Sequence, residues 1–286
     1  SPAQFILMLI TDNHMHIDPL RGMGLDAVRE FSSAGGTHFM LVYKTAYDSG
    51  TEVKTGKDFG KAYDYVIELS NKINKETDAQ SYPIIGLHPA EFHHLIIDFG
   101  GEKAFEIALE ALNEIEKRIS DGLAFGIGEV GRPHYDVDKE ITEMSNQFLI
   151  EVLKVSKRLK CPVQLHTETF DENKFIELGE LVKKHGDPGK VIKHFSPPMV
   201  SVCEKIGIYP SIIAREKNIM KACEEGRRFL METDYIDDNE RPGAVVGPKT
   251  VPKTTKKLFE KGVLSKEDID YIHRYLIEEI YGIELI

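Results

Sequence analysis

The 286-residue sequence has no tryptophan, only three cysteines, and fewer basic than acidic side chains, with 36 Lys and Arg against 47 Asp and Glu. The cysteines Cys161, Cys203 and Cys223 are widely spaced and form no C-x-x-C pair. This spacing predicts buried thiols in a reducing cytoplasm rather than disulfides or catalytic thiols. An ordinary soluble composition, with 41% hydrophobic and 29% charged residues, excludes disordered and fibrous classes.

The shortage of positive charge also limits the partners that the protein can bind. A formal net charge of −11 argues against a broad basic surface that coats nucleic acid. It does not exclude an enzyme that contacts a few phosphates through metal ions. The apolar run Phe5–Ile10 is too short to span a membrane and lacks the flanks of a signal peptide, so we expect a cytoplasmic protein without a membrane or an obligate protein partner.

Short apolar segments alternate with long amphipathic ones along the chain. Helical spacing of apolar residues occurs over Lys103–Ser120, Lys139–Leu159 and Asp171–His185. Eight segments are predicted strands: Phe5–Thr11, His38–Tyr43, Tyr82–Gly86, Ala124–Gly128, Pro162–His166, Val191–Phe195, Ile208–Ile212 and Phe229–Thr233. Alternating strands and helices indicate a parallel sheet covered by helices. Eight such units predict a single (β/α)8 TIM-barrel domain over residues 1–286.

Two long segments follow predicted strands and are expected to be loops at the C-terminal face of the barrel, where active sites of this fold are built. They are Ala46–Phe59 and Tyr235–Lys257. The seventh unit, within Val200–Gly226, is the least regular of the eight, because two units must fit between His194 and Asp234.

The segment Asp12-Asn13-His14-Met15-His16-Ile17-Asp18 closes the first predicted strand. Side chains at i and i+2 of a strand point to the same face, so His14 and His16 project toward one point, as a metal ion requires. Asp12 and Asp18 are expected to orient the two imidazoles by accepting from their second ring nitrogens. A satisfied core histidine is the alternative for either residue alone.

Further ligand-type residues follow later predicted strands: Glu129, His166, His194 and Asp234. Each could simply cap a helix or end a strand, but together with the histidine pair they indicate a metal site. Imidazole and carboxylate donors without thiolate suit Zn, Mn or Mg.

Taken together, these segments resemble the TatD-like metal-dependent hydrolases (the TatD DNase family) of the amidohydrolase superfamily. The resemblance rests on the Asp12–Asp18 segment, Gly86-Leu87-His88-Pro89, Gly128-Glu129-Val130-Gly131, His166, His194-Phe195-Ser196 and Glu232-Thr233-Asp234, in the family's order over most of the chain. It implies that one ion is held by His14, His16, Glu129 and Asp234. It implies a second ion on Glu129, His166 and His194, with the Glu129 carboxylate bridging the two.

The expected chemistry is hydrolysis by metal-activated water. Two divalent ions about 4 Å apart can clamp the attacking and leaving oxygens. Asp234 is expected to hold the water and shuttle its proton, and Glu232 to support a ligand histidine from below. His88 and Arg132 are the candidates for substrate binding, His88 through a phosphate oxygen, with a structural hydrogen bond as its alternative.

The segments expected around the substrate depart from the family pattern. Gly131-Arg132-Pro133-His134-Tyr135 stands where the family has Gly-Leu-Asp, Thr167-Glu168-Thr169 replaces an Arg-containing sequence, and Pro197-Pro198 follows Phe195-Ser196. We therefore expect a phosphoesterase or deoxyribonuclease acting on a small or short phosphorylated substrate, including DNA ends. The alternatives are another hydrolase acting on an amide, lactone or phosphomonoester, and a metal-binding barrel without turnover.

Overall fold

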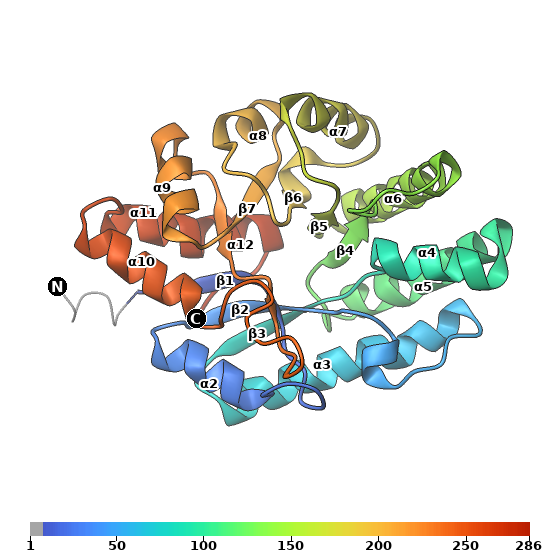
Figure 1. Ribbon diagram of the computed structural model, residues 1–286, viewed down its shortest axis with the longest axis horizontal. Helices are drawn as coiled ribbons and strands as arrows, with labels where there is room; N and C mark the ends of the chain where they lie inside the picture. The colour runs from blue at the N-terminus through green and yellow to red at the C-terminus, as the bar shows by residue number, and fades with distance from the viewer. Residues whose placement is uncertain (1–7) are drawn as a thin grey trace.

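The computed structural model describes residues 8–286, in which parallel strands form the interior and helices surround them (Figure 1). The strands are β1 Thr11–His16, β2 His38–Val42, β3 Gln80–Ile84, β4 Ile127–Gly131, β5 Val163–His166, β6 Val191–Lys193, β7 Tyr209–Ile213, β8 Leu230–Glu232 and the two-residue β9 Tyr235–Ile236. The helices are α2 Leu25–Ser33, α3 Phe59–Glu76, α4 Pro89–Phe99, α5 Gly101–Ser120, α6 Lys139–Leu159, α7 Glu172–His185, α8 Val200–Ile206, α9 Glu216–Glu225, α10 Thr250–Glu260, α11 Lys266–Asp270 and α12 Leu276–Tyr281.

Backbone hydrogen bonds join two parallel sheets, of order β3-β2-β1-β9 and β4-β5-β6-β7-β8, at both edges. At the first edge, Ile85 bridges to Ile127, and Gly128 N donates to the Ile85 carbonyl at 3.0 Å. At the second edge, β9 continues β8 beyond Asp234 and pairs with β1, while Asp234 N donates to the His14 carbonyl at 3.0 Å. The predicted (β/α)8 barrel is confirmed.

The first strand lies later than predicted. It runs over Thr11–His16 rather than Phe5–Thr11, and residues 5–7 of the predicted strand lie outside the described residues. All six residues of β1 are buried, although most are polar, because their side chains find hydrogen-bond partners inside the barrel. Asp12, for example, accepts from the Thr233 hydroxyl at 2.6 Å. The histidine pair therefore lies within the strand and not beyond its end.

The helical predictions hold closely. Helix α6 has the predicted bounds, α5 begins two residues earlier than predicted, and α7 begins one residue later, because the Asp171 side chain caps it. The seventh unit is regular but short, with α8 and α9 on either side of β7. The predicted loop Tyr235–Lys257 is wrong in its second half, where α10 begins at Thr250.

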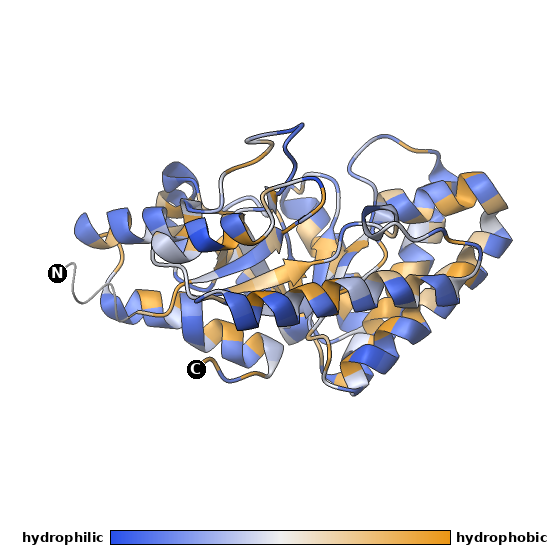
Figure 2. Cartoon of the chain, turned by 90° about the horizontal axis from the view of Figure 1, so that it is seen from below, coloured by the Kyte–Doolittle hydropathy of each residue, from blue (hydrophilic) through white to orange (hydrophobic). Residues whose placement is uncertain are grey.

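The helices pack on the barrel through apolar faces, which Figure 2 shows as orange bands beside blue ones around largely orange strands. The C-terminal helix joins α11 to α12 through a π-helical turn, Tyr271–Tyr275. Within that turn the buried His273 accepts from Thr11 N at 3.1 Å, so this helix closes the end of the barrel where β1 begins. Burial lowers the pKa of His273 to about 4, which keeps it neutral and structural.

Within residues 8–286, no helix combines the length and apolar character needed to span a bilayer. Cys161 and Cys203 are buried as predicted, whereas Cys223 is half-buried. Burial raises the pKa of the Cys161 and Cys203 thiols to about 12, so both stay protonated and unreactive.

Candidate metal centre

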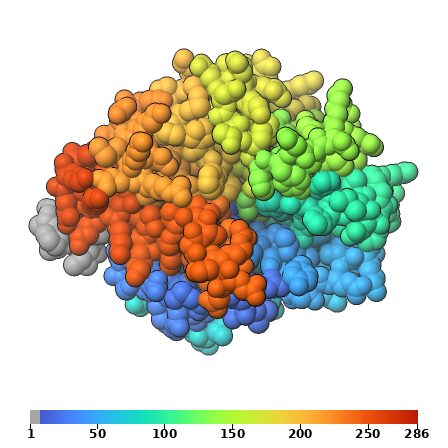
Figure 3. Space-filling view, in the orientation of Figure 1, coloured from blue at the N-terminus to red at the C-terminus, as the bar shows by residue number. Residues whose placement is uncertain are grey.

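A pocket of about 580 Å³ lies over the strand ends and holds most of the titratable groups predicted from the sequence. His16, Glu129, His166, His194 and Asp234 all line it. Ile236 of β9 and Arg241 of the segment that follows it also line the pocket, and this orange segment lies across the middle of the face in Figure 3. The volume falls in the range typical of small-molecule sites.

Hydrogen bonds on the far side of the rings determine which nitrogens of the histidine pair face the centre. His14 Nδ1 donates to the Gln164 amide oxygen at 2.6 Å, and His16 Nδ1 donates to the Val42 carbonyl at 2.8 Å. Because both partners are acceptors, the neutral form of each ring carries its proton on Nδ1 and presents a lone pair at Nε2. The two Nε2 atoms lie 3.1 Å apart.

Two carboxylates complete this group. Glu129 Oε2 lies 3.6 Å from His14 Nε2 and 3.4 Å from His16 Nε2, and Asp234 Oδ1 lies 3.5 Å from each. Four acceptor atoms in this space repel one another unless a cation lies among them. The donor set, nitrogen and oxygen without sulfur, fits a divalent ion such as Zn, Mn or Mg.

A second group lies around the other Glu129 oxygen. Oε1 is 2.9 Å from His166 Nδ1 and 3.2 Å from His194 Nε2. Behind His194, the Glu232 carboxylate lies 2.6 Å from Nδ1, which is the support from below that the sequence suggested. Glu129 thus contacts both groups through its two oxygens, in the position expected of a bridge.

The charges of the centre favour a cation. Burial opposes a charged ring at His16, but the Asp234 and Glu129 carboxylates outweigh it and raise the pKa to about 9. The pKa of His194 is raised for a related reason, with Glu232 as the largest carboxylate contribution against burial. Burial disfavours the charged form of Glu129, yet the neighbouring His14 and His194 hold its pKa well below the usual range. Positive charge at this position is therefore stabilised.

His88 differs from the other histidines in the nitrogen that it presents. It caps α4 by accepting from Ala90 N through Nδ1 at 3.0 Å, so the proton of the neutral ring lies on Nε2. Burial lowers the pKa of His88 to about 3, which keeps the ring neutral. Nε2 is 3.9 Å from Glu129 Oε1, close to the centre but with a hydrogen in place of a lone pair. His88 is therefore arranged as a donor and not as a metal ligand.

Arg132 needs a different interpretation from the one made on sequence. Its side chain is 8% exposed, and its Nη2 and Nε lie 2.9 and 3.2 Å from the two oxygens of Glu168. A buried, bidentate pair of this kind is not free to bind substrate. The cationic side chains that line the pocket are Lys44, Lys193 and Arg241.

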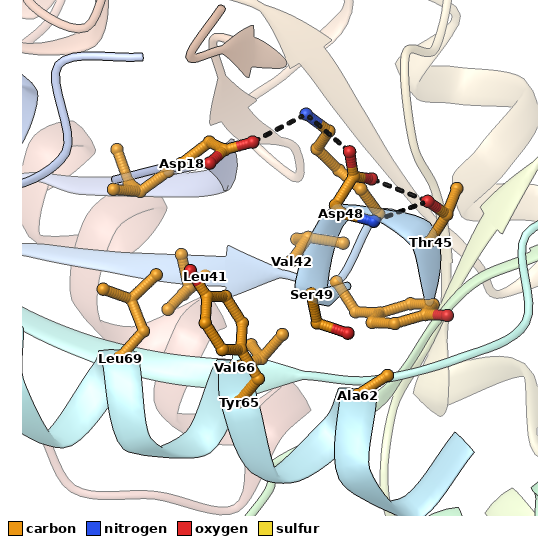
Figure 4. A pocket seen from close by; sticks show the side chains of 13 residues that line it. Asp18, Leu41, Val42, Thr45, Asp48, Ser49, Ala62, Tyr65, Val66 and Leu69 are labelled. Atoms are coloured by element: carbon orange, nitrogen blue, oxygen red, sulfur yellow. Dashed lines mark hydrogen bonds and ion pairs between the residues drawn. The ribbon is translucent and has the colours of Figure 1, made fainter. Parts of the chain in front are cut away.

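The predicted orienting role of Asp12 and Asp18 is also wrong, because Gln164 and the Val42 carbonyl occupy the ring nitrogens. Asp12 instead joins β1 to β8 through Thr233. Asp18 instead lies beside Lys44, whose Nζ is 3.8 Å from Asp18 Oδ2 and 3.8 Å from Asp48 Oδ1. Figure 4 shows Asp18 on one side of this cluster and Asp48 on the other. The cavity here is about 30 Å³, too small for a substrate.

Two contributors were missed on sequence. Gln164 is a polar residue in an otherwise apolar strand, two residues before His166, and this signal could have identified it as inward-facing. His134 lines the pocket, and its Nδ1 lies 2.9 Å from His166 Nε2, on the side of the ring opposite Glu129. No sequence pattern links His134 to His166, because the contact joins the loop after β4 to the last residue of the neighbouring strand β5.

A parallel α/β barrel with clustered imidazole and carboxylate donors at its strand ends defines the class of metal-dependent TIM-barrel hydrolases. Within that class, the family described as TatD related DNase matches residues 11–282, and the chain belongs to this family. An uncharacterized protein of Methanocaldococcus jannaschii is 38% identical over 279 residues, covering 96% of each chain.

Solved structures share the fold at low sequence identity. The TatD homologue YjjV from Escherichia coli superposes with a TM-score of 0.68 at 18% identity, covering 96% of this chain and 98% of its own. The phosphotriesterase homology protein from Escherichia coli, solved with phosphate in its active site, has a TM-score of 0.65 at 13% identity, with 96% and 98% covered. The chain is a hydrolase of this family, and groups of histidine and carboxylate side chains that could hold a metal ion lie close together in it.

Proposed function

We propose that the protein is a phosphoesterase that holds two divalent metal ions and cleaves short phosphodiesters, including the ends of nucleic acids. The observation that carries the proposal is the convergence of His14, His16, Glu129 and Asp234, whose acceptor atoms face one another at 3.1–3.6 Å. His14, His16, Glu129 and Asp234 would hold one ion, and Glu129, His166 and His194 the other.

Bound there, the ions would lower the pKa of a water toward neutrality and offset the charge of the phosphate. The protein's own part begins with Asp234, whose side chain is 13% exposed at the edge of the pocket. Its carboxylate would accept the proton of the attacking water and return it to the leaving oxygen. Glu232 and Gln164 would keep His194 and His14 in the tautomer that faces the centre.

Phosphate recognition would come from groups around the same pocket. His88 Nε2–H is aimed toward the centre and would donate to a phosphoryl oxygen. Arg241 is an exposed cation that lines the same pocket and would contact a second phosphate oxygen or a neighbouring phosphate. The phosphate in the active site of the phosphotriesterase homology protein supports this class of ligand.

A metal-supplemented assay over phosphodiesters, phosphomonoesters, single-stranded DNA, lactones and amides tests the proposal. We expect turnover of phosphodiesters and short DNA that a chelator abolishes and added metal restores. Hydrolysis of lactones or amides alone would contradict the proposal that the substrate is a phosphoester. Full activity in excess chelator would contradict the metal-dependent mechanism.

A further inference from the structure

We propose that Phe195 is a stacking platform for a flat aromatic group of the substrate, such as a nucleobase next to the cleaved phosphate. The inference rests on the proposed phosphoesterase function and assigns the part of the substrate that lies beside the phosphate. Phe195 lines the pocket and is 46% exposed, and its ring centroid lies 6.0 Å from that of His194, with the ring planes at 82°.

The backbone at Phe195 is strained. Its φ of +50° lies in the left-handed region, which bulky residues rarely adopt and which glycine or asparagine would occupy more easily. The conformation is held from both sides, because Phe195 N donates to Glu232 Oε1 at 3.4 Å and Ser196 N donates to the Ser211 carbonyl at 2.8 Å.

Phe is among the residues that are most often buried, but Phe195 is nearly half exposed. Residues with strained backbone conformations cluster at active sites and ligand-binding sites. Asp234, the residue proposed to move the proton, has a similar φ of +48° and lines the same pocket. The strain at Phe195 therefore lies beside the reacting groups.

The pocket that Phe195 lines is suited to a planar apolar group with a phosphate attached. Ile236, two residues after Asp234, and Ala90 add apolar surface to a pocket whose remaining lining is mostly polar or charged. The exposed Arg241 supplies positive charge in the same pocket, whereas Lys44 lies between Asp18 and Asp48. Stacking on an aromatic ring tolerates any base because every base has a π-face, so we expect selectivity for an aromatic group rather than for one sequence.

The absence of tryptophan from the chain allows a direct binding test. Phe195→Trp introduces a single fluorescent reporter in the pocket, and Tyr275→Trp is a matched control in the C-terminal helix at the opposite end of the barrel, where Tyr275 is 58% exposed. With Mg²⁺ present, thymidine 5′-monophosphate should change the emission of the Phe195→Trp protein saturably, ribose 5-phosphate should not, and the control should respond to neither. Equal responses to both ligands, or to neither ligand, would overturn the stacking role.

A kinetic comparison tests the same role in turnover. The substrates are a thymidine dinucleotide and its counterpart that lacks the base on the nucleoside retaining the phosphate. Both substrates therefore release the same alcohol. We expect kcat/KM to favour the thymidine dinucleotide by about 10- to 100-fold, Phe195→Leu to remove the preference, and Phe195→Trp to keep it.

An unchanged ratio in a folded Phe195→Leu protein would contradict the inference. Failure to cleave either dinucleotide would count against the proposed function instead, and the fluorescence titration would then decide the stacking role alone. If Phe195→Leu does not fold, equal rates on the two dinucleotides in the unaltered protein would still refute the preference.

Discussion

Individual histidines in the pocket differ in which nitrogen carries the proton, and that difference divides their roles. His14 and His16 donate outward through Nδ1 and turn lone pairs toward the centre, whereas His88 accepts through Nδ1 and turns a hydrogen inward. The assignment follows from the partners, a side-chain amide oxygen, a backbone carbonyl and a backbone N–H. In the neutral rings, the partner of Nδ1 therefore distinguishes the proposed metal ligands from the proposed substrate donor.

His88→Asn separates the two roles of that residue. Asparagine is a good helix cap and keeps an acceptor for Ala90 N, but it lacks the inward donor. We expect the free energy of unfolding to change by no more than about 0.5 kcal/mol, while kcat/KM for phosphodiesters falls by about 10- to 100-fold. His94→Asn, an exposed position on the same helix, should leave both unchanged. A drop in stability without a drop in kcat/KM would make His88 purely structural.

Asp234→Asn tests the proton transfer. Asparagine tolerates the left-handed backbone at this position and keeps one oxygen toward the centre, but it cannot hold the proton. We expect kcat to fall by about 10²- to 10⁴-fold with most of the bound metal retained, measured by steady-state kinetics and elemental analysis. The exposed Asp136→Asn is the control. Near-normal kcat in Asp234→Asn would assign the proton to another group.

At the scale of elements, the C-terminal helix braces the centre from below the barrel. Tyr281 OH, at the end of α12, donates to Asn13 Oδ1 at 2.6 Å and accepts from Gln164 Nε2 at 2.7 Å. The Gln164 amide oxygen in turn accepts from His14. A buried chain of hydrogen bonds therefore connects a helix at one end of the barrel to the candidate metal centre at the other.

Tyr281→Phe removes the hydroxyl and leaves two buried polar partners without it. We expect the free energy of unfolding to fall by about 1–3 kcal/mol. Gln164→Ala should weaken metal binding by about 10- to 100-fold, and Tyr281→Phe should weaken it less. Urea unfolding and metal titration measure the two effects. The exposed Tyr275→Phe is the matched control, and equal stability of the two variants would refute the brace.

Helix α4 holds the loop after β2 through Glu91, which accepts from Tyr43 OH at 2.8 Å and from Ala46 N at 2.7 Å. Burial raises the pKa of Glu91 from its ordinary 4.5 to about 8. Between pH 4.5 and about pH 8, the Glu91 carboxyl group has therefore lost its proton in the unfolded chain but retains it in the folded protein. Stability therefore falls as pH rises through this range.

Glu91→Gln should remove that dependence. We expect the variant to lose less stability than the unaltered protein between pH 5 and pH 8, measured by urea unfolding at each pH. Glu102→Gln, exposed at the start of α5, should follow the unaltered protein. Parallel pH curves for Glu91→Gln and the unaltered protein would show that Glu91 does not titrate in this range.

At the scale of the whole molecule, the alternation of strands and helices was sufficient to predict the barrel, and the spacing of ligand-type residues predicted which strand ends meet. The polar strand β1 was misplaced because apolar runs predict strands only where the barrel interior is apolar, and here residues such as Asp12 and Asn13 pair inside it. Arg132 was misassigned because its partner Glu168 is 36 residues away in sequence. Such contacts depend on the fold and leave no local pattern.

The net charge of the whole molecule also affects which substrates it can bind. The net charge of −11 disfavours a grip on long duplex DNA, while the centre itself attracts cations through Glu129 and Asp234. An acidic protein with a candidate cation site is expected to bind a short substrate, whose phosphate would contact the bound ions and a few hydrogen-bond donors.

The metal content of the protein after loading and gel filtration is the decisive measurement for the proposed two-ion centre. We predict about two divalent ions per chain, and a fall in occupancy at both positions in Glu129→Ala, because one carboxylate contacts both donor groups. Well under one ion per chain in the unaltered protein, or unchanged content in Glu129→Ala, would contradict the account.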